Sequence, residues 1–181
     1  MYVPRYIFFT TGTGVSKEKL SSFENALFDA GISQFNLVKV SSIYPPEAKI
    51  IDINEGMEIL QPGQVVHCVL SRLESQEPGR RMVASVGLAL PVEKGHYGFL
   101  SEHYGFGQSK EEAGTYSERL AICMLANTEG EEICPDESYN SDEDLYIVKG
   151  KKIESSNYTI ATTGAEDGLW TTVISAAILV P

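Results

Sequence analysis

The segment "NLVKVSSIYPPEAKI", residues 36–50, departs most clearly from an ordinary strand-and-loop pattern. A short apolar run ends in two adjacent serines, Ser41 and Ser42, and the prolines Pro45 and Pro46 follow. Serine and proline are common in surface loops, so a plain loop is one interpretation. The apolar run before the serines, however, is expected to be buried, and a buried hydroxyl needs a hydrogen-bond partner or a chemical role.

Adjacent serines at the end of a strand have one such role, which is cleavage of their own backbone. If the Ser41 carbonyl is strained and held by donors, the Ser42 hydroxyl can attack it, and the acyl group moves from nitrogen to oxygen. Elimination from this ester frees residues 1–41 as a separate chain. The dehydroalanine left at position 42 then hydrolyses to a pyruvoyl group and ammonia, so the segment is a candidate cleavage site.

The composition is that of one soluble globular domain. A chain of 181 residues can bury about 70% of its unfolded surface and needs no staples. The net charge of −11, from 14 basic and 25 acidic residues, argues against binding nucleic acid through phosphates and suits a cationic small ligand better. Much of the acid lies in residues 129–144, which are predicted to form a solvated surface loop.

The cysteines and histidines predict neither a disulfide framework nor a metal site. The three cysteines are odd in number and far apart, and the three histidines lack metal-ligand spacing. The apolar stretches at both ends of the chain are too short for a signal peptide or a bilayer span. We therefore expect a cytoplasmic protein that binds no metal and inserts into no membrane.

The periodicity of apolar residues predicts a strand-rich α+β domain with about two helices. One helix is predicted from Ser16, as N-cap, to Gly31, and the other spans residues 109–127 with Ser109 as its cap. The "GTG" of residues 12–14 is interpreted as a plain turn, because the third glycine of a phosphate-binding loop is absent. Strands are predicted at residues 5–10, 35–40, 62–75, 81–90, 144–149, 158–163 and 169–180, the third and fourth forming a hairpin.

The segment "GFLSEHYGFG", residues 98–107, surrounds Glu102 with aromatic residues and glycines. A carboxyl group held among apolar side chains keeps its proton to higher pH, because desolvation penalises the charged form. Such a group can donate a proton near neutrality. The motif alone leaves open whether Glu102 is a proton donor or an ordinary loop carboxylate.

Taken together with "RYIFFTTGTG" and "TTGAEDGLWTTVISAAILV", these motifs resemble those of the pyruvoyl-dependent arginine decarboxylases over nearly the whole chain. The resemblance implies a four-layer αββα sandwich in a single domain, residues 1–181, that cleaves itself into a small chain, 1–41, and a large chain, 42–181. It also implies a homotrimer with active sites between neighbouring subunits, and it leaves open whether trimers pair into hexamers.

The resemblance assigns a role to each candidate site residue. Ser42 becomes the covalent pyruvoyl cofactor, Ser41 becomes the new carboxyl terminus, and Asn36 helps to position the groups at the cleavage point. Glu102 protonates the substrate carbon after carbon dioxide leaves. Glu24 binds the guanidinium of arginine, although Asp is the usual residue in the family.

The activity implied is conversion of L-arginine to agmatine and carbon dioxide through a Schiff base on the pyruvoyl group, with no external cofactor. The side chains Tyr97, Phe99 and Tyr104 are expected to keep Glu102 protonated. Two alternatives stay open: a pyruvoyl decarboxylase for another amino acid such as histidine, and an uncleaved, non-catalytic member that binds a cationic metabolite.

Overall fold

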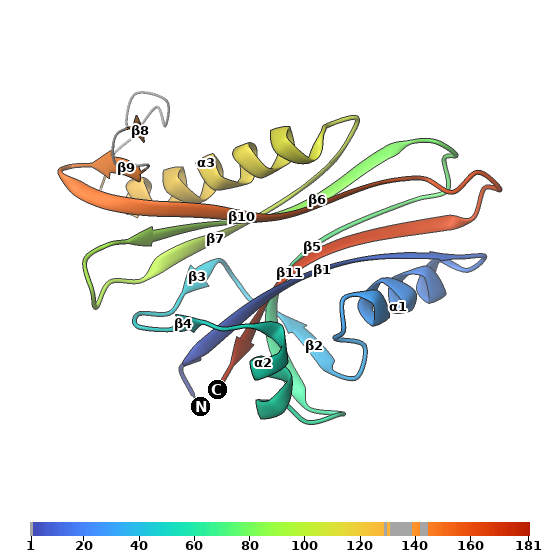
Figure 1. Cartoon of the computed structure of the whole chain (residues 1–181), viewed down its shortest axis with the longest axis horizontal. Coiled ribbons are helices and arrows are strands. Elements are labelled where there is room, and N and C mark those ends of the chain that lie inside the picture. Colours follow the sequence, from blue (N-terminus) through green and yellow to red (C-terminus); the bar gives the residue numbers. More distant parts are fainter. Residues whose placement is uncertain (1, 129, 131–138, 142–144) are drawn as a thin grey trace.

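The computed structural model describes residues 2–128, 130, 139–141 and 145–181 as a sandwich of four layers (Figure 1). Two helices cover one sheet, a second sheet packs against the first, and a third helix covers the second sheet. This arrangement confirms the predicted αββα architecture. The predicted acidic loop at residues 129–144 lies largely outside the described residues, as does Cys134.

The first sheet has five strands and carries the two shorter helices on its outer face. Its strand order is β2 (Asn36–Lys39), β5 (Val65–Ser75), β11 (Trp170–Val180), β1 (Tyr6–Ser16) and β4 (Lys49–Ile50). The helices are α1 (Lys19–Asp29) and α2 (Ile53–Ile59). Strand β1 is therefore internal, antiparallel to β11 along eleven residue pairs and parallel to β4 on its other side.

The second sheet has six strands and is covered by the long helix α3 (Lys110–Thr128). Its strand order is β3 (Ile43–Tyr44), β7 (Gly98–Phe106), β6 (Arg81–Pro91), β10 (Lys151–Thr163), β9 (Leu145–Val148) and β8 (Tyr139–Asn140). The predicted cap of α3 is confirmed, because the Glu112 N–H donates to the Ser109 hydroxyl at 3.1 Å and the Ser109 N–H donates to the Glu112 carboxylate at 2.7 Å.

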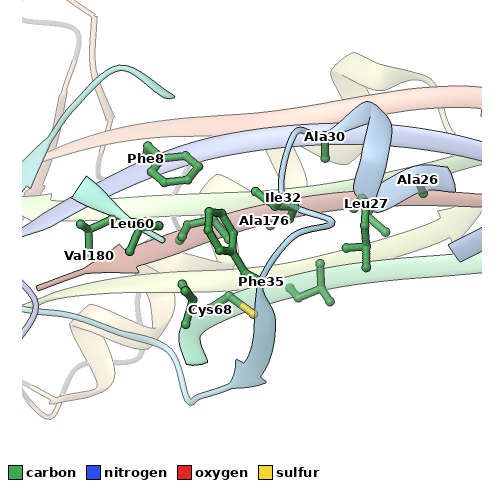
Figure 2. Close-up of a cluster of buried hydrophobic side chains, with 14 residues drawn as sticks. Phe8, Ala26, Leu27, Ala30, Ile32, Phe35, Leu60, Cys68, Ala176 and Val180 are labelled. Atoms are coloured by element: carbon green, nitrogen blue, oxygen red, sulfur yellow. The ribbon is translucent and has the colours of Figure 1, made fainter. Parts of the chain in front are cut away.

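The apolar side chains of each strand alternate between two cores, as the two-residue period of a strand requires. Phe8 points outward into the cluster under the helices, where its ring lies against Gly56 of α2, whereas its neighbour Ile7 packs between the sheets. Figure 2 shows the outer cluster, in which Leu27 of α1 and Phe35 lie over Cys68 and Ala176 of the sheet. The inter-sheet cluster includes Val69, Leu88, Leu100 and Leu179. Both faces of each sheet therefore carry buried side chains.

The predicted turn at residues 12–14 is wrong, because β1 continues through it to Ser16. A Cβ added at Gly12 would collide with the Ala26 carbonyl oxygen, and one at Gly14 with the Ser22 carbonyl oxygen. Both glycines thus allow α1 to lie directly on the strand. The predicted N-cap at Ser16 is also wrong, since the helix starts two residues later, after Glu18, with no side-chain cap bond.

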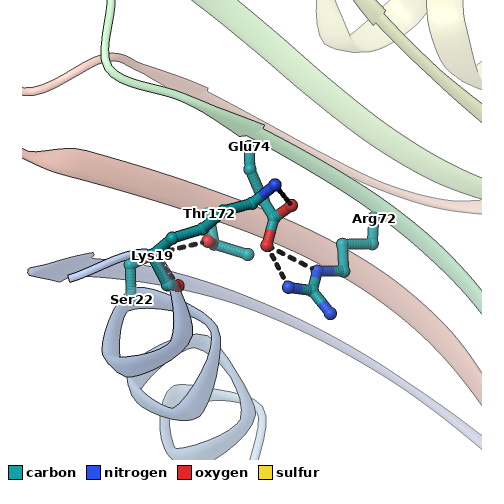
Figure 3. A network of polar contacts seen from close by, with 5 residues as sticks. All are labelled: Lys19, Ser22, Arg72, Glu74 and Thr172. Atoms are coloured by element: carbon teal, nitrogen blue, oxygen red, sulfur yellow. Dashed lines mark hydrogen bonds and ion pairs between the residues drawn. The ribbon is translucent and has the colours of Figure 1, made fainter.

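A polar network fixes the start of α1 to the sheet (Figure 3). The Lys19 ammonium lies 3.0 Å from Glu74, which also pairs with Arg72, and the hydroxyls of Ser22 and Thr172 are 2.7 Å apart. The Arg72 guanidinium additionally stacks on the ring of Phe23 at 3.5 Å (not drawn in that figure). Each of these contacts is between two side chains, and those of Lys19, Ser22 and Phe23 join residues before position 42 to residues after it.

The predicted hairpin of residues 62–75 and 81–90 is wrong, because these strands belong to different sheets. Strand β5 pairs with β2 and β11, while β6 pairs with β7 and β10. The connection after β5 crosses from one layer to the other beside the connection after β10, and the two are joined by backbone hydrogen bonds of Gly164 with Gly79 and Arg80. Sequence adjacency alone does not distinguish a crossing from a hairpin.

No helix among the residues that the structure describes has the length and apolar character to cross a membrane.

Candidate active site

The chain crosses from one sheet to the other at Ser41 and Ser42. The Val40 N–H donates to the Cys68 carbonyl at 3.0 Å and so extends the pairing of β2 with β5 in the first sheet. Two residues later, the Ser42 carbonyl accepts from the Leu100 N–H at 2.7 Å, which begins the pairing of β3 with β7 in the second sheet. The peptide bond between the two serines therefore links two rigid layers.

The double proline belongs to the return path to the first sheet. Tyr44 is buried, and its hydroxyl donates to the Ala48 carbonyl at 2.6 Å. Between them, Pro45 and Pro46 precede Glu47, which has a left-handed backbone with φ of 62°. This tight turn sends the chain back to β4, so the prolines stiffen a reversal that follows within a few residues of the first crossing.

The serines are more exposed than the sequence suggests. The run before them was expected to be buried, but β2 is an edge strand and Val38 is 42% exposed. Ser41 is exposed and Ser42 is half-buried. Ser41 also lines an open groove with His67 and Leu179. A reagent in solution can therefore reach the crossing.

Glu102 lies on β7, two residues along the strand from Leu100, whose N–H binds the Ser42 carbonyl. It points to the same face of β7 as Leu100 of the inter-sheet cluster, and its side chain is 27% exposed. Glu102 forms an ion pair with Lys39, whose Nζ lies 2.9 Å from the Glu102 Oε2. The crossing, a carboxylate and an ammonium therefore meet at one place.

The predicted aromatic surroundings of Glu102 are not found. Phe99 packs against the cluster under α3, on the opposite face of the sheet, because neighbouring strand residues point to opposite faces. Tyr97 pairs with Phe99, their ring centroids being 5.9 Å apart. Tyr104 is 55% exposed and so encloses little. The residue that defines the environment of Glu102 is Lys39 of β2.

Cys68 lies on β5 opposite Lys39. Burial raises the pKa of its thiol to about 11, with Lys39 acting to lower the pKa and Glu102 acting to raise it. The thiol is therefore neutral at physiological pH, and its side chain packs in the outer cluster with Leu27 and Phe35.

The other two predicted site residues lie elsewhere in the chain. Asn36 begins β2, and its side-chain amide donates to the Gly63 carbonyl at 2.8 Å. Five residues of extended strand, about 17 Å, separate Asn36 from Ser41. Glu24 is exposed on α1, which covers the outer face of the five-stranded sheet. A single chain thus brings together Ser41, Ser42 and Glu102 but neither Asn36 nor Glu24.

Sequence reasoning missed two contributors to this site. The first is Lys39, whose signal was a single cation inside the apolar run two residues before the serines. The second is the backbone N–H of Leu100, which no residue-type pattern can reveal because every residue except proline carries that donor. Together they add a cation to the carboxylate and a donor to the carbonyl beside the crossing.

Comparisons with known proteins match the whole of this fold. The family model described as pyruvoyl-dependent arginine decarboxylase matches residues 6–181. A probable pyruvoyl-dependent arginine decarboxylase of Chloroherpeton thalassium is 49% identical over 180 residues, 99% of either chain, and one of Chlorobium phaeovibrioides is 48% identical over the same span. The pyruvoyl-dependent arginine decarboxylase of Methanococcoides burtonii is 45% identical over 178 residues, 98% of this chain and 99% of that protein.

Proposed function

Since this chain belongs to the pyruvoyl-dependent arginine decarboxylase family, we propose that it cleaves itself between Ser41 and Ser42 and converts L-arginine to agmatine and carbon dioxide. The observation that carries the proposal is the sheet crossing itself. The serine peptide bond lies between two hydrogen-bonded layers, and Glu102 is adjacent to it.

In the cleavage, the Ser42 Oγ attacks the Ser41 carbonyl carbon, and the bond from that carbon to the Ser42 nitrogen breaks. The ester formed loses the α-proton of residue 42 and expels the Ser41 carboxylate. Water then replaces the nitrogen of the dehydroalanine, which leaves as ammonia. Rigid hydrogen bonding on both sides of the crossing, to Cys68 and to Leu100, supports this proposal because it holds the reacting backbone while the bond breaks.

The residues around position 42 fit a pyruvoyl group. Such a group keeps the carbonyl of residue 42 as an amide, and the Leu100 N–H that binds this oxygen at 2.7 Å would hold it. Strand β3 continues from there, with Ile43 opposite Phe99, and would fix the direction of the group. A pyruvoyl ketone supplies the electron sink that amino-acid decarboxylation requires. Glu102 is placed to move a proton to the substrate α-carbon.

The positions of Asn36 and Glu24 support a site completed by a second copy of the chain. In the proposed homotrimer, Asn36 and Glu24 of one subunit approach Ser42 and Glu102 of its neighbour. A carboxylate from Glu24 would pair with the guanidinium of arginine, which is always charged and presents its donors in a planar fork. The negative net charge of the protein favours the same cationic substrate.

Mass spectrometry under denaturing conditions, paired with an agmatine assay, tests the proposal. The purified protein should yield fragments of residues 1–41 and 42–181, the second with a blocked amino terminus, and should produce agmatine from arginine. A panel including histidine tests the substrate, because a site with a carboxylate for guanidinium should reject imidazole. An intact chain with no activity would refute the proposed function.

Mixed oligomers test the shared site. Glu24→Ala and Ser42→Ala proteins should each be inactive, and co-expression should restore part of the activity, because some interfaces then combine an intact Glu24 with an intact Ser42. In the matched control, the Ser42→Ala and Glu102→Gln proteins are co-expressed. Ser42 and Glu102 of one site lie in the same chain, so this mixture should restore less activity. Light scattering should give the mass of a trimer or a multiple of it, and a monomer would exclude the shared site.

A further inference from the structure

The ion pair between Lys39 and Glu102 poses a problem for a carboxyl group whose expected role is to donate a proton. An ammonium 2.9 Å away stabilises a carboxylate relative to the uncharged acid. A resting enzyme that needed a protonated Glu102 would be hindered by this neighbour. The structure therefore raises the question of where the donated proton comes from.

The substrate can supply it. An amino acid reaches the enzyme with its α-amine protonated, and the amine has to lose a proton before it can attack a ketone. An ionised Glu102 is a base at the right place for that proton. After carbon dioxide has left, the same carboxylic acid can return the proton to the α-carbon, and the product amine takes up one proton from solvent when hydrolysis of the Schiff base releases it.

We propose that Lys39 is a positioning residue that holds Glu102 ionised in the resting enzyme, so that Glu102 first accepts the α-ammonium proton and then delivers it to the α-carbon. This inference rests on the proposed function and adds the resting charge of Glu102 and the origin of the proton. Lys39 lies on β2, two residues before the cleavage point, so its strand and the carboxylate on β7 meet across the crossing.

The surroundings of Glu102 are consistent with this role. The strand beside β7 presents Val86 opposite Glu102, and on β5 the Ser71 hydroxyl donates to the carbonyl of His103, the residue after Glu102, at 2.6 Å. The neighbouring imidazole of His103 points away, toward Gln108 and Tyr116 under α3. Among the described residues, the charge that faces Glu102 at ion-pair distance is Lys39.

The pH dependence of kcat/KM separates the two possible resting states. Lys39→Met removes the cation that lies 2.9 Å from the Glu102 carboxylate. If the resting enzyme needs a carboxylate, the acid limb of kcat/KM moves to higher pH and the value near pH 6 falls, by about two- to fivefold for a half-exposed pair. If the resting enzyme needs the acid, the value at neutral pH rises instead, and that result would overturn the inference.

Controls isolate the pair from general damage. Lys19→Met removes an ammonium of similar exposure, 53% against 54%, from an ion pair of similar length, 3.0 Å, and should leave the pH profile unchanged. Lys39→Arg keeps the cation and should keep the profile. In a Glu102→Gln background, Lys39→Met should have no further effect on kcat/KM, whereas an effect of unchanged size would exclude action through Glu102.

Rates are to be divided by the cleaved fraction measured by mass spectrometry, and Lys39→Gln replaces Lys39→Met if the latter does not fold. The outcome for this inference then differs from that for the proposed function. A wild-type protein that neither cleaves nor forms agmatine refutes the function itself. A cleaved, active wild type whose Lys39 variants keep its pH profile refutes only the role of Lys39.

Discussion

Hydroxyl groups gather in two regions of this molecule, and the contrast between them separates structure from chemistry. Under α3, the hydroxyls of Ser85, Ser117 and Thr159 are buried. The Ser85 hydroxyl lies 2.7 Å from that of Ser117 and 2.6 Å from that of Thr159. At the sheet crossing, Ser41 is exposed and Ser42 is half-buried. Buried, mutually satisfied hydroxyls join a helix to a sheet, while accessible ones can react.

Close packing explains why the first region is inert. Strand β6 approaches α3 so tightly that a Cβ at Gly87 would collide with the Ser117 carbonyl, and the Ser101 hydroxyl donates to that same carbonyl at 2.5 Å. No water or reagent needs to enter, and each donor has an acceptor. At the crossing, Leu100 holds the backbone of Ser42, and no described residue makes a hydrogen bond to the Ser42 side chain.

Removing the reactive hydroxyl should have the largest effect. Ser42→Ala lacks the nucleophile of the proposed cleavage, so we expect an intact chain of 19.8 kDa and no detectable agmatine. Denaturing mass spectrometry and a product assay measure both. Ser85→Ala, from the buried region, is the matched control and should still cleave. Cleavage of Ser42→Ala at the same bond would show that the contrast has no chemical basis.

The next effect concerns the carboxyl group beside the crossing. Glu102→Gln keeps the shape of the side chain but can neither accept nor donate the proton, so kcat should fall by about 10²- to 10⁴-fold. Cleavage should still occur, since the Ser42 hydroxyl is intact. Steady-state kinetics on the cleaved protein provide the measurement. Activity equal to that of the wild type would remove Glu102 from the reaction.

The buried region should respond in stability. Ser85→Ala removes hydroxyl contacts from a dry interface, while Ser117 still donates to Gly114 and Thr159 to Asn157, so the free energy of unfolding should fall by about 1 kcal/mol. Chemical denaturation measures the loss. Ser33→Ala, at an exposed turn, should change it by less than about 0.5 kcal/mol. Equal losses in the two variants would contradict the assignment of a structural role.

The smallest effect is expected at the exposed start of α3. Hydrogen bonds from the backbone and the hydroxyl of Ser109 lower the pKa of Glu112, with a weaker contribution from Arg81. A lowered pKa in the folded state stabilises the protein above the unfolded value of about 4.5, and this contribution is lost as the pH falls through the folded value.

Glu112→Gln should therefore lower the Tm slightly at pH 7 and leave it closer to that of the wild type at pH 3. Thermal unfolding at both pH values measures this difference. Glu111→Gln, an exposed neighbour in the same helical turn, is the control. A deficit in Glu112→Gln that is as large at pH 3 as at pH 7 would exclude the capping carboxylate as its cause.

Local signals predicted part of the fold well. The start of α3 was predicted from Ser109 as its cap, and the structure confirms this cap and adds Glu112 as its reciprocal partner within the same turn. The extension of β1 was not, because Gly12 and Gly14 resemble a turn until α1 is seen lying on them. Helix α2 was missed as well, although Asp52 caps it, since only seven residues with one internal glycine carry the signal.

The candidate site was predictable in its chemistry and not in its geometry. Ser41, Ser42 and Glu102 are the residue types that the chemistry requires, and their motifs are distinctive. Their meeting depends on a pairing between strands more than fifty residues apart, which no local pattern encodes. The Lys39 contact depends on the same pairing. Asn36 and Glu24 stay predictions, because their proposed roles concern a neighbouring subunit.

The internal position of β1 has a consequence for the order of folding and the proposed scission. Its strand belongs to residues 1–41, yet β11 flanks it on one side and β4 on the other, and both come from beyond position 42. Neither piece alone could assemble that sheet. The bond between them acts as a tether that keeps the loop-closure cost of folding low, and it becomes dispensable once the sheet has formed. The proposed scission must therefore follow folding, and the two pieces would stay interlocked until the whole sandwich unfolds.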